Sequence, residues 1–403
     1  MSPTSAHLPT ALRHLEMSGT PLRIGLCGAG AMGRGIAAAI RRTPGMSLSW
    51  VADTVADRAA HAAALGAAPA HDTCTHSLLD ARPVDVFVEA STAIHAAAGY
   101  ATHAIATGAH IVWMNAEADL AYGPAIARAA RARGLIATSD AGDQHGVLAR
   151  LLDEVESWGW RTVHAGNIKG FLDETATPES LRHEAEIRRL DPRACCAYTD
   201  GTKLAIEMVI LANARGLLVP EGGMRGPATT HVEEALTRFD LTRALASPEV
   251  DYLLGAAPGG GVYVIGHVDD PEEQFFLDYY KLGKGPFYLH YRPCHLCHLE
   301  TPLAIATAAI HHHPILAAGP RHNEVFTVAK RTLPAGTPIH HAIGSPDVRG
   351  VAARHTPGDP RVPIWMLHDT PGVRLAKPVA CGEWITQNDL DGLPPAAEWG
   401  EVG

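Results

Sequence analysis

The chain has 403 residues, 46% of them hydrophobic, which is enough for two or three domains with buried cores. Its formal net charge is −10 and no run of Lys and Arg occurs, which argues against a nucleic-acid-binding surface. No apolar stretch approaches the roughly 20 residues of a membrane helix. Seven cysteines without the spacing of a small disulfide scaffold indicate reduced thiols and a cytoplasmic protein. The first 20 residues lack a signal peptide's apolar core and are expected to form a loose leader.

The most informative segment spans residues 24–53. An apolar strand over 22–27 runs into G-x-G-x-x-G at 28–33, and a helical run and a second strand lead to Asp53. In this pattern the glycines permit a tight turn, a close approach to a pyrophosphate, and helix–strand packing, while N–H groups at the helix start bind phosphate. A carboxylate at the position of Asp53 accepts ribose hydroxyls and repels a 2′-phosphate, so it favours NAD over NADP. Arg58 lies close in sequence and would soften that preference, so both cofactors stay open.

Further strands over 84–90, 110–115 and 135–138 alternate with helical runs, which predicts an α/β domain with a doubly wound parallel sheet. Ligands of such sheets bind beyond the carboxyl ends of the strands. Side chains at these ends are therefore candidates, although turns and helix caps explain them equally well. The predicted cofactor-binding residues are Gly28, Ala29, Gly30, Ala31, Met32, Gly33, Asp53, Ser91, Thr92 and Asn115, with the loop 139–144 close to the nicotinamide.

From about residue 145 the pattern changes to a second α/β layer, which includes a long apolar helix over 204–217. In the last 80 residues, 333–339 resemble 379–385, each a strand, a glycine turn and a strand, which predicts a small β module. The expected organisation is a leader over 1–20, a dinucleotide-binding domain over 21–145, a catalytic domain over 146–320 and a β domain over 321–403.

The start of the long helix carries the main catalytic candidates. Thr199 or Asp200 is the expected N-cap, and Lys203 lies in the first turn, where a cation opposes the helix dipole. A bound phosphate or carboxylate would compensate for this unfavourable interaction. Backbone N–H groups, Thr202 and Lys203 would bind it. Alternatively Lys203 polarises a substrate carbonyl and donates a proton. The plain structural alternative is an exposed ion pair between Lys203 and Glu207, one turn along the helix.

Weaker substrate-binding candidates are Lys169, Arg225 and His295. Cys294 and Cys297 have the C-x-x-C spacing of zinc ligands, but the second ligand pair that a structural zinc needs is missing. No metal ligands are therefore assigned, and a divalent metal is expected only if an isomerisation precedes reduction.

Several segments together resemble one group of enzymes: Ser139-Asp140-Ala141-Gly142-Asp143-Gln144, Gly166-Asn167-Ile168-Lys169-Gly170-Phe171, Thr199-Asp200-Gly201-Thr202-Lys203 and Gly285-Pro286-Phe287-Tyr288 with residues 291–302. The group is the homoserine-dehydrogenase-like oxidoreductases with a C-terminal SAF domain, and its best described branch, which the chain resembles, is the 1-deoxy-D-xylulose 5-phosphate reductoisomerase-like enzymes. The resemblance implies an N-terminal Rossmann domain, an α/β catalytic domain and a C-terminal SAF β-clip. It also implies that Asp200 and Lys203 serve proton transfer.

The resemblance has departures. Homoserine dehydrogenases typically carry T-x-N-K after the fourth strand, and residues 113–117 have no such lysine, which disfavours homoserine as substrate. Cys294 and Cys297 are unexpected in the reductoisomerase-like branch, and Asp53 fits NADPH poorly.

The sequence therefore predicts an NAD(P)-dependent oxidoreductase that reduces a small polyhydroxylated, anionic and phosphorylated keto substrate such as 1-deoxy-D-xylulose 5-phosphate. Lys203 and Asp200 are the expected catalytic residues, and Thr202, Lys169, Glu207, Arg225 and His295 the expected substrate-binding ones. The alternatives are a simple dehydrogenase of a sugar acid or polyol, and a non-catalytic nucleotide-binding sensor. A cytoplasmic homo-oligomer without nucleic-acid or membrane partners is expected.

Overall fold

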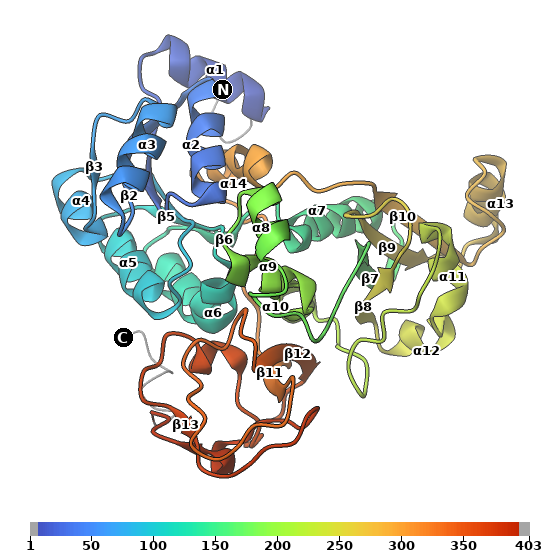
Figure 1. Cartoon of the computed structure of the whole chain (residues 1–403). Coiled ribbons are helices and arrows are strands. Elements are labelled where there is room, and N and C mark those ends of the chain that lie inside the picture. Colours follow the sequence, from blue (N-terminus) through green and yellow to red (C-terminus); the bar gives the residue numbers. More distant parts are fainter. Residues whose placement is uncertain (1–6, 395–403) are drawn as a thin grey trace. The chain divides into compact units, whose positions relative to one another are not determined.

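The computed structural model describes residues 7–394 (Figure 1). The described residues form two compact units. The first contains the chain up to Gly146 together with Leu296–Ala318, and the second contains Val147–His295 together with Gly319–Pro394.

The first unit is built on a parallel sheet of six strands in the order β3-β2-β1-β4-β5-β6. This order reverses between β1 and β4, which is the position where doubly wound sheets bind dinucleotides. The predicted α/β fold is confirmed. The strands are β1 Leu22–Cys27, β2 Met46–Ala52, β3 His71–Asp72, β4 Val86–Glu89, β5 His110–Trp113 and β6 Ala137–Ser139. The helices that follow them are α2 Ala31–Arg42, α3 Ala56–Gly66, α4 Thr75–Ala81, α5 His95–Ala106 and α6 Ala116–Ala132.

The expected loose leader is wrong for most of its described residues. Helix α1 spans Leu8–Met17, with Pro9 in its first turn, where the missing N–H costs nothing. Ala11 and Leu12 are buried in the apolar core of the first unit. An amphipathic helix whose apolar side covers a core is an integral part of the unit.

Helix α14, Cys297–His311, belongs to the first unit although it follows the second in sequence. Ala304 and Ile305 of α14 are fully buried in the same core cluster as Ile36 and Ile40 of α2. The structure therefore differs from the expected catalytic domain over 146–320, because residues 296–318 return to the dinucleotide-binding unit.

The second unit contains a four-stranded mixed sheet in the order β10-β9-β7-β8. Only β7 and β8 run parallel; β7–β9 and β9–β10 are antiparallel. The strands are β7 Arg161–Lys169, β8 Glu249–Leu254, β9 Val262–His267 and β10 Phe287–Arg292. The helices are α7 Gln144–Ser157, α8 Arg182–Arg188, α9 Pro192–Thr199, α10 Thr202–Arg215, α11 Ala235–Arg238, α12 Leu241–Ala246 and α13 Pro271–Tyr279, with the 3-10 turn η2 Val232–Glu234. Helix α10 is buried along nearly all its length, as its apolar sequence predicts.

The C-terminal region, Gly319–Pro394, contains only short strands and 3-10 turns: β11 Asn323–Ala329, β12 Val348–Arg354, β13 Arg374–Leu375, β14 Leu390–Asp391, η3 Ile364–Leu367 and η4 Gln387–Asp389. Its predicted β character is confirmed. The two copies of the predicted repeat pair with each other, because Leu333 and Val379 form an antiparallel bridge. Both glycine turns adopt left-handed backbone, with φ of 80° at Gly336 and 83° at Gly382.

Candidate functional site

The glycine-rich loop between β1 and α2 has the geometry that its sequence predicts. Gly28 has φ of 93°, and a Cβ there would lie 2.5 Å from the backbone of Ala90. A Cβ on Gly33 would lie 1.9 Å from the carbonyl oxygen of Gly28, so only glycine permits this helix–strand contact. Gly30 is the N-cap of α2 without a side-chain cap, and a Cβ there would have no heavy atom within 4 Å. The start of α2 therefore leaves room for a ligand close to its backbone.

Asp53 lies directly against this loop. Its carboxylate accepts a hydrogen bond from the backbone N–H of Ala29 at 2.7 Å and another from Val55 at 2.8 Å. Two backbone donors fix the orientation of the carboxylate beside the start of α2, where Ala31 and Met32 form the first turn. The structure thus brings the predicted loop and acid together.

The residues beyond β4 and β5 are engaged within the first unit. Ser91 donates from its backbone N–H and its hydroxyl to Oε1 of buried Glu89, at 2.8 and 2.5 Å. Asn115 caps α6 by accepting from the N–H of Ala118 at 3.0 Å, and its amide donates to the carbonyl oxygen of Ala93 at 2.8 Å. These contacts match the alternative interpretation, in which the residues at the strand ends form turns and helix caps. Thr92, which follows Ser91 in the chain, is exposed. Glu89 is a further strand-end carboxyl that is not among the predicted site residues, and burial raises its pKa.

Two buried carboxyls are part of the surroundings of the loop 139–144: Asp140 lies within the loop and Asp119, on α6, contacts it. Burial raises the pKa of Asp140 to about 7 although the N–H of Gly142 donates to it at 2.6 Å. Burial also raises the pKa of Asp119 to about 7, although the hydroxyl of Ser139 donates to it at 2.5 Å and thereby lowers the pKa in part. The loop packs on the start of α14, since the N–H of Cys297 donates to the carbonyl oxygen of Gly142 at 3.0 Å.

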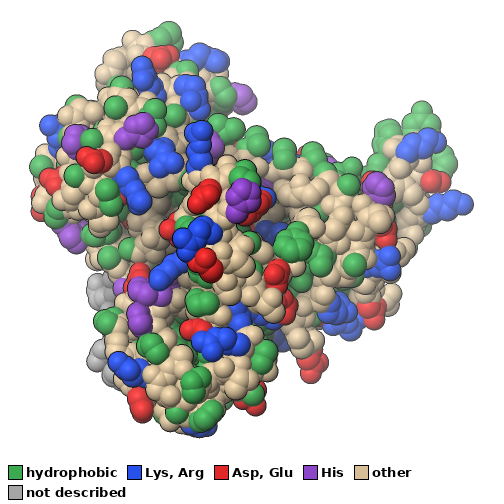
Figure 2. Space-filling view, in the orientation of Figure 1, with side chains coloured by type: hydrophobic (Ala, Val, Ile, Leu, Met, Phe, Trp, Pro, Cys, Tyr) green, Lys and Arg blue, Asp and Glu red, His purple; other side chains and the backbone are tan. Residues whose placement is uncertain are grey.

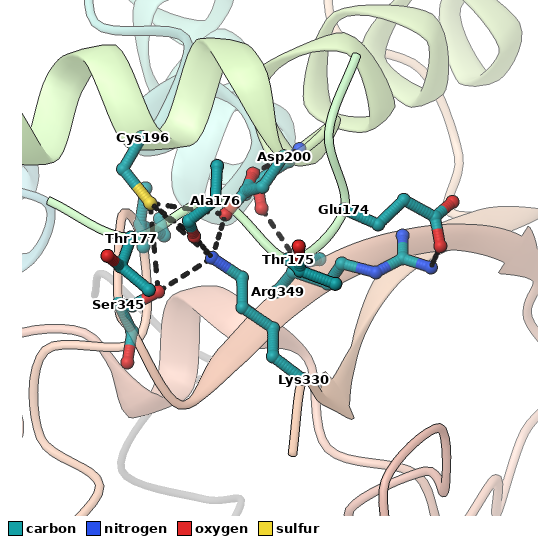
Figure 3. A network of polar contacts seen from close by, with 12 residues as sticks. Glu174, Thr175, Ala176, Thr177, Cys196, Asp200, Lys330, Ser345 and Arg349 are labelled. Carbon is teal, nitrogen blue, oxygen red and sulfur yellow. Dashed lines mark hydrogen bonds and ion pairs between the residues drawn. The ribbon is translucent and has the colours of Figure 1, made fainter. Parts of the chain in front are cut away.

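In the second unit, the start of α10 already contains an anion. The N-cap is Gly201, with φ of 87°, and not Thr199 or Asp200 as expected. Asp200 is fully buried, and its Oδ1 accepts from the backbone N–H of Thr202 at 2.9 Å. Its Oδ2 lies 2.7 Å from Nζ of Lys330, which comes from the C-terminal region (Figure 3).

Lys330 is held on all sides. Its ammonium also donates to the carbonyl oxygens of Ala176 and Ser345, both at 2.7 Å, so its three N–H donors have partners, and the Sγ of Cys196 lies 3.4 Å away (Figure 3). Nothing in its sequence context, an apolar strand followed by Lys-Arg, indicates this role.

The hydroxyl of Thr202 accepts from the backbone N–H of Gly350 at 2.9 Å. The expectation of a ligand's phosphate or carboxylate at this helix start is therefore corrected: the carboxylate is Asp200, and Thr202 contacts the C-terminal region.

Lys203 and Glu207 are buried one turn apart on α10, with 7% and 4% of their surfaces exposed. The alternative of an exposed ion pair is therefore wrong. Asn167, fully buried on β7, donates from Nδ2 to Oε2 of Glu207 at 3.4 Å. Charged side chains are seldom buried without polar partners, so this cluster is the strongest chemical candidate in the second unit. Lys169, another candidate, is half-buried at the end of the same strand.

The other substrate candidates have internal partners. Nε of Arg225 lies 3.5 Å from Oδ2 of fully buried Asp251, which also accepts the backbone N–H of Arg225 at 3.0 Å. His295 donates from Nδ1 to the carbonyl oxygen of Gly260 at 2.7 Å. Cys294 is exposed, and none of the seven cysteines, all of which lie within residues 7–394, forms a disulfide. Within residues 7–394, no group of three or more His, Cys, Asp or Glu side chains is placed to hold a metal.

Two family models match the chain. Residues 28–138 match the NAD binding domain of homoserine dehydrogenase, and residues 142–301 match the catalytic domain of oxidoreductase DRL. Both matched models describe domains of oxidoreductases, and one of them is an NAD-binding domain. Comparison with curated proteins finds no significant match. No helix in the described part of this oxidoreductase has the length and apolarity needed to cross a membrane.

Solved structures with some similarity include GenD2 from gentamicin A biosynthesis in complex with NAD, at 22% identity over 38% of this chain and 45% of that protein, with a TM-score of 0.30. Myo-inositol dehydrogenase from Lactobacillus casei, in complex with NAD(H) and myo-inositol, has 19% identity over 42% of this chain and 53% of its own, with a TM-score of 0.32. The oxidoreductase thus aligns with about half the length of these proteins, and such TM-scores carry no functional assignment.

Proposed function

We propose that this oxidoreductase transfers a hydride between a nicotinamide dinucleotide and a small polyhydroxylated, anionic keto substrate, with Lys203 as the residue that polarises and protonates the substrate oxygen. The observation that carries the proposal is the buried cluster of Lys203, Glu207 and Asn167 within the segment that matches an oxidoreductase catalytic domain. Such a cluster costs stability through desolvation, which a purely structural role would not require.

The residues of the first unit fit the dinucleotide. The start of α2 has no side-chain cap, Gly30 leaves open space beside it, and the Asp53 carboxylate is fixed next to the loop. These groups would hold the pyrophosphate and the adenosine ribose, with NAD favoured because a 2′-phosphate would meet the charge of Asp53. When bound, the nicotinamide supplies or accepts the hydride.

In the direction of reduction, the carbonyl oxygen gains negative charge as its carbon accepts the hydride. The ammonium of Lys203 stabilises that charge and donates the proton, so that the carbonyl becomes an alcohol and the lysine becomes neutral. Glu207 orients Lys203 from the next turn, and the Asn167 amide holds Glu207. Asp200, with both oxygens bound, positions the start of α10 and does not contact the substrate in this proposal.

The finer proposal follows the resemblance: a reductoisomerase-like reaction on a phosphorylated keto-sugar such as 1-deoxy-D-xylulose 5-phosphate, with the C-terminal β region as a SAF domain. The described residues supply no metal ligand set, and no step is assigned to a metal. The alternative is reduction of a sugar acid or polyol without rearrangement. Product analysis separates the two, because an unchanged carbon skeleton contradicts the reductoisomerase-like reaction.

The test is a screen of phosphorylated keto-sugars and sugar acids with NADH and NADPH, followed through the absorbance of the reduced nicotinamide. Once the screen has found a substrate and a cofactor that react, Lys203→Ala should lower kcat by a factor of about 10² or more, because proton transfer in the transition state is lost. Dinucleotide affinity should be unchanged in that variant. Lys377→Ala, which removes an exposed lysine of the C-terminal region, is the matched control. Full turnover in Lys203→Ala would remove the lysine from the mechanism, and absence of any dinucleotide binding would contradict the whole proposal.

A further inference from the structure

Helix α13, Pro271–Tyr279, is the most exposed helix of the second unit, and none of its residues is buried. It stands beyond the edge strand β10 in Figure 1. Four aromatic side chains lie largely in solvent: Phe275 is 64% exposed, Phe276 46%, Tyr279 67% and Tyr280 64%. Figure 2 shows apolar side chains gathered over this helix.

The helix is well formed despite its isolation. Asp270 caps it by accepting from the N–H of Glu272 at 2.9 Å, and Pro271 occupies the first turn. Glu273 anchors it to the sheet by accepting from Nε1 of Trp160 at 3.1 Å. Because the aromatic residues are spaced i, i+1, i+4 and i+5, they share one side of the helix. The fold thus holds an aromatic face outward, which we call the α13 face (residues 275, 276, 279 and 280).

The area of the α13 face is large for a surface left in water. Aromatic side chains each present about 150–250 Å², so at these exposures the four contribute on the order of 400–600 Å². Monomers rarely expose more than a patch of this size. Two such faces in contact would bury about 1,000 Å², which reaches the area that a specific interface needs.

The charges along the helix identify the partner. Exposed acids stand at its start, with Asp269, Asp270 and Glu272, while its other end has one exposed acid, Asp278, followed by the two lysines Lys281 and Lys284. Two copies of the helix that run antiparallel across a two-fold axis would bring each acidic start against the lysines of the other copy. A parallel arrangement would place like charges together. We propose that the α13 face is a dimerisation surface, on which a second copy of this chain docks its own α13 antiparallel.

The first test measures mass by light scattering or sedimentation. The wild-type chain should be a dimer at micromolar concentration, and Phe275→Asp/Tyr279→Asp should be monomeric with unchanged far-UV circular dichroism, since neither side chain is buried within the protomer. Met17→Asp, at a methionine 80% exposed on α1, is the matched control and should stay dimeric. A wild-type chain that is monomeric up to about 100 µM, where micromolar interfaces are saturated, would overturn the proposal. So would a dimer that survives the double substitution.

The second test addresses the antiparallel arrangement. Asp269→Lys/Glu272→Lys cancels the negative charge at the start of the helix, where Asp270 and Glu273 remain, and Lys281→Glu/Lys284→Glu makes both ends negative. Each variant alone should be monomeric or at least tenfold weaker as a dimer, and an equimolar mixture should form a heterodimer. Variants that dimerise alone as well as wild type, or that fail to combine, would contradict the arrangement. These measurements do not depend on the proposed reaction, because they read mass and not turnover.

Discussion

The starts of α2 and α10 both have sequences that predict an anion site, yet the structure treats them differently. At α2 the N-cap is Gly30, no side chain caps the helix, and open space lies beside the glycine. At α10 the N-cap is again a glycine, Gly201, but the Asp200 carboxylate accepts the N–H of Thr202 and is itself paired with Lys330.

The difference shows that a helix N-terminus is available to a ligand only when the chain does not supply its own anion. Both helix starts have the positive end of a helix dipole and N–H groups that have no partner within the helix itself. Asp200 removes that availability at α10, and Lys330 makes the burial of Asp200 tolerable. Lys203 on α10 is thereby left to the cluster with Glu207 and Asn167, away from any role in gripping a phosphate at the helix start.

The largest expected effect comes from removing the cation at α10. Lys330→Met should lower the free energy of unfolding by about 3–5 kcal/mol, because it leaves the Asp200 carboxylate buried and unpaired. Urea unfolding measures this. The double variant Asp200→Asn/Lys330→Met should recover part of the loss, and Lys377→Met, which breaks an exposed pair with Asp389, should change little. An equal, small effect of both single lysine substitutions would contradict the structural role of Lys330.

A second prediction compares Asp200 with a buried carboxyl that has no cation. Burial raises the pKa of Asp119 in the folded chain to about 7, well above the ordinary value of an aspartate, so its contribution to stability is full below about pH 4 and is lost as pH rises to 7. Asp119→Asn should therefore gain stability relative to wild type across that range, by about 4 kcal/mol, and then stay level above pH 7. Thermal unfolding at several pH values measures the difference. A difference independent of pH would show that folding does not raise the pKa of Asp119.

A third prediction gives the start of α2 a carboxylate of its own, as Asp200 provides at the start of α10. Gly30→Asp should weaken dinucleotide binding by about 100-fold, because a carboxylate would occupy the place of the pyrophosphate and repel it. The fold should be retained, since a Cβ at this position meets no neighbour. Calorimetric titration with NAD and NADP measures the affinity, and Gly30→Ala is the control, with a smaller effect. Undiminished binding in Gly30→Asp would place the dinucleotide elsewhere.

The smallest expected effect separates the two interpretations of Thr202. Thr202→Val should cost about 1–3 kcal/mol in stability, because the buried N–H of Gly350 loses its acceptor. The KM for substrate should not change. An unchanged unfolding free energy with a raised KM would return Thr202 to the substrate-binding role that its sequence position suggests.

Local rules were sufficient for the dinucleotide-binding half. The roles of Gly28 and Gly33 follow from backbone geometry within one strand–turn–helix unit, and the structure has the predicted turn and the predicted close contact. The β character of the last 80 residues could also be predicted from the sequence, because the repeated glycine turns at Gly336 and Gly382 are local signals. The same local rules failed at residues 1–20, where a short helix gains its stability from packing on a core far along the chain.

By itself, the sequence determined the alternation of strands and helices, the order of the glycine loop and Asp53, and the apolar nature of α10, since each depends on neighbours within about thirty residues. Only the tertiary structure decided that Asp200 meets a lysine 130 residues later, that Lys203 and Glu207 are buried and not exposed, and that α14 rejoins the first unit. Burial and ion pairing are properties of segments brought together from distant parts of the chain, and no spacing in the sequence records them.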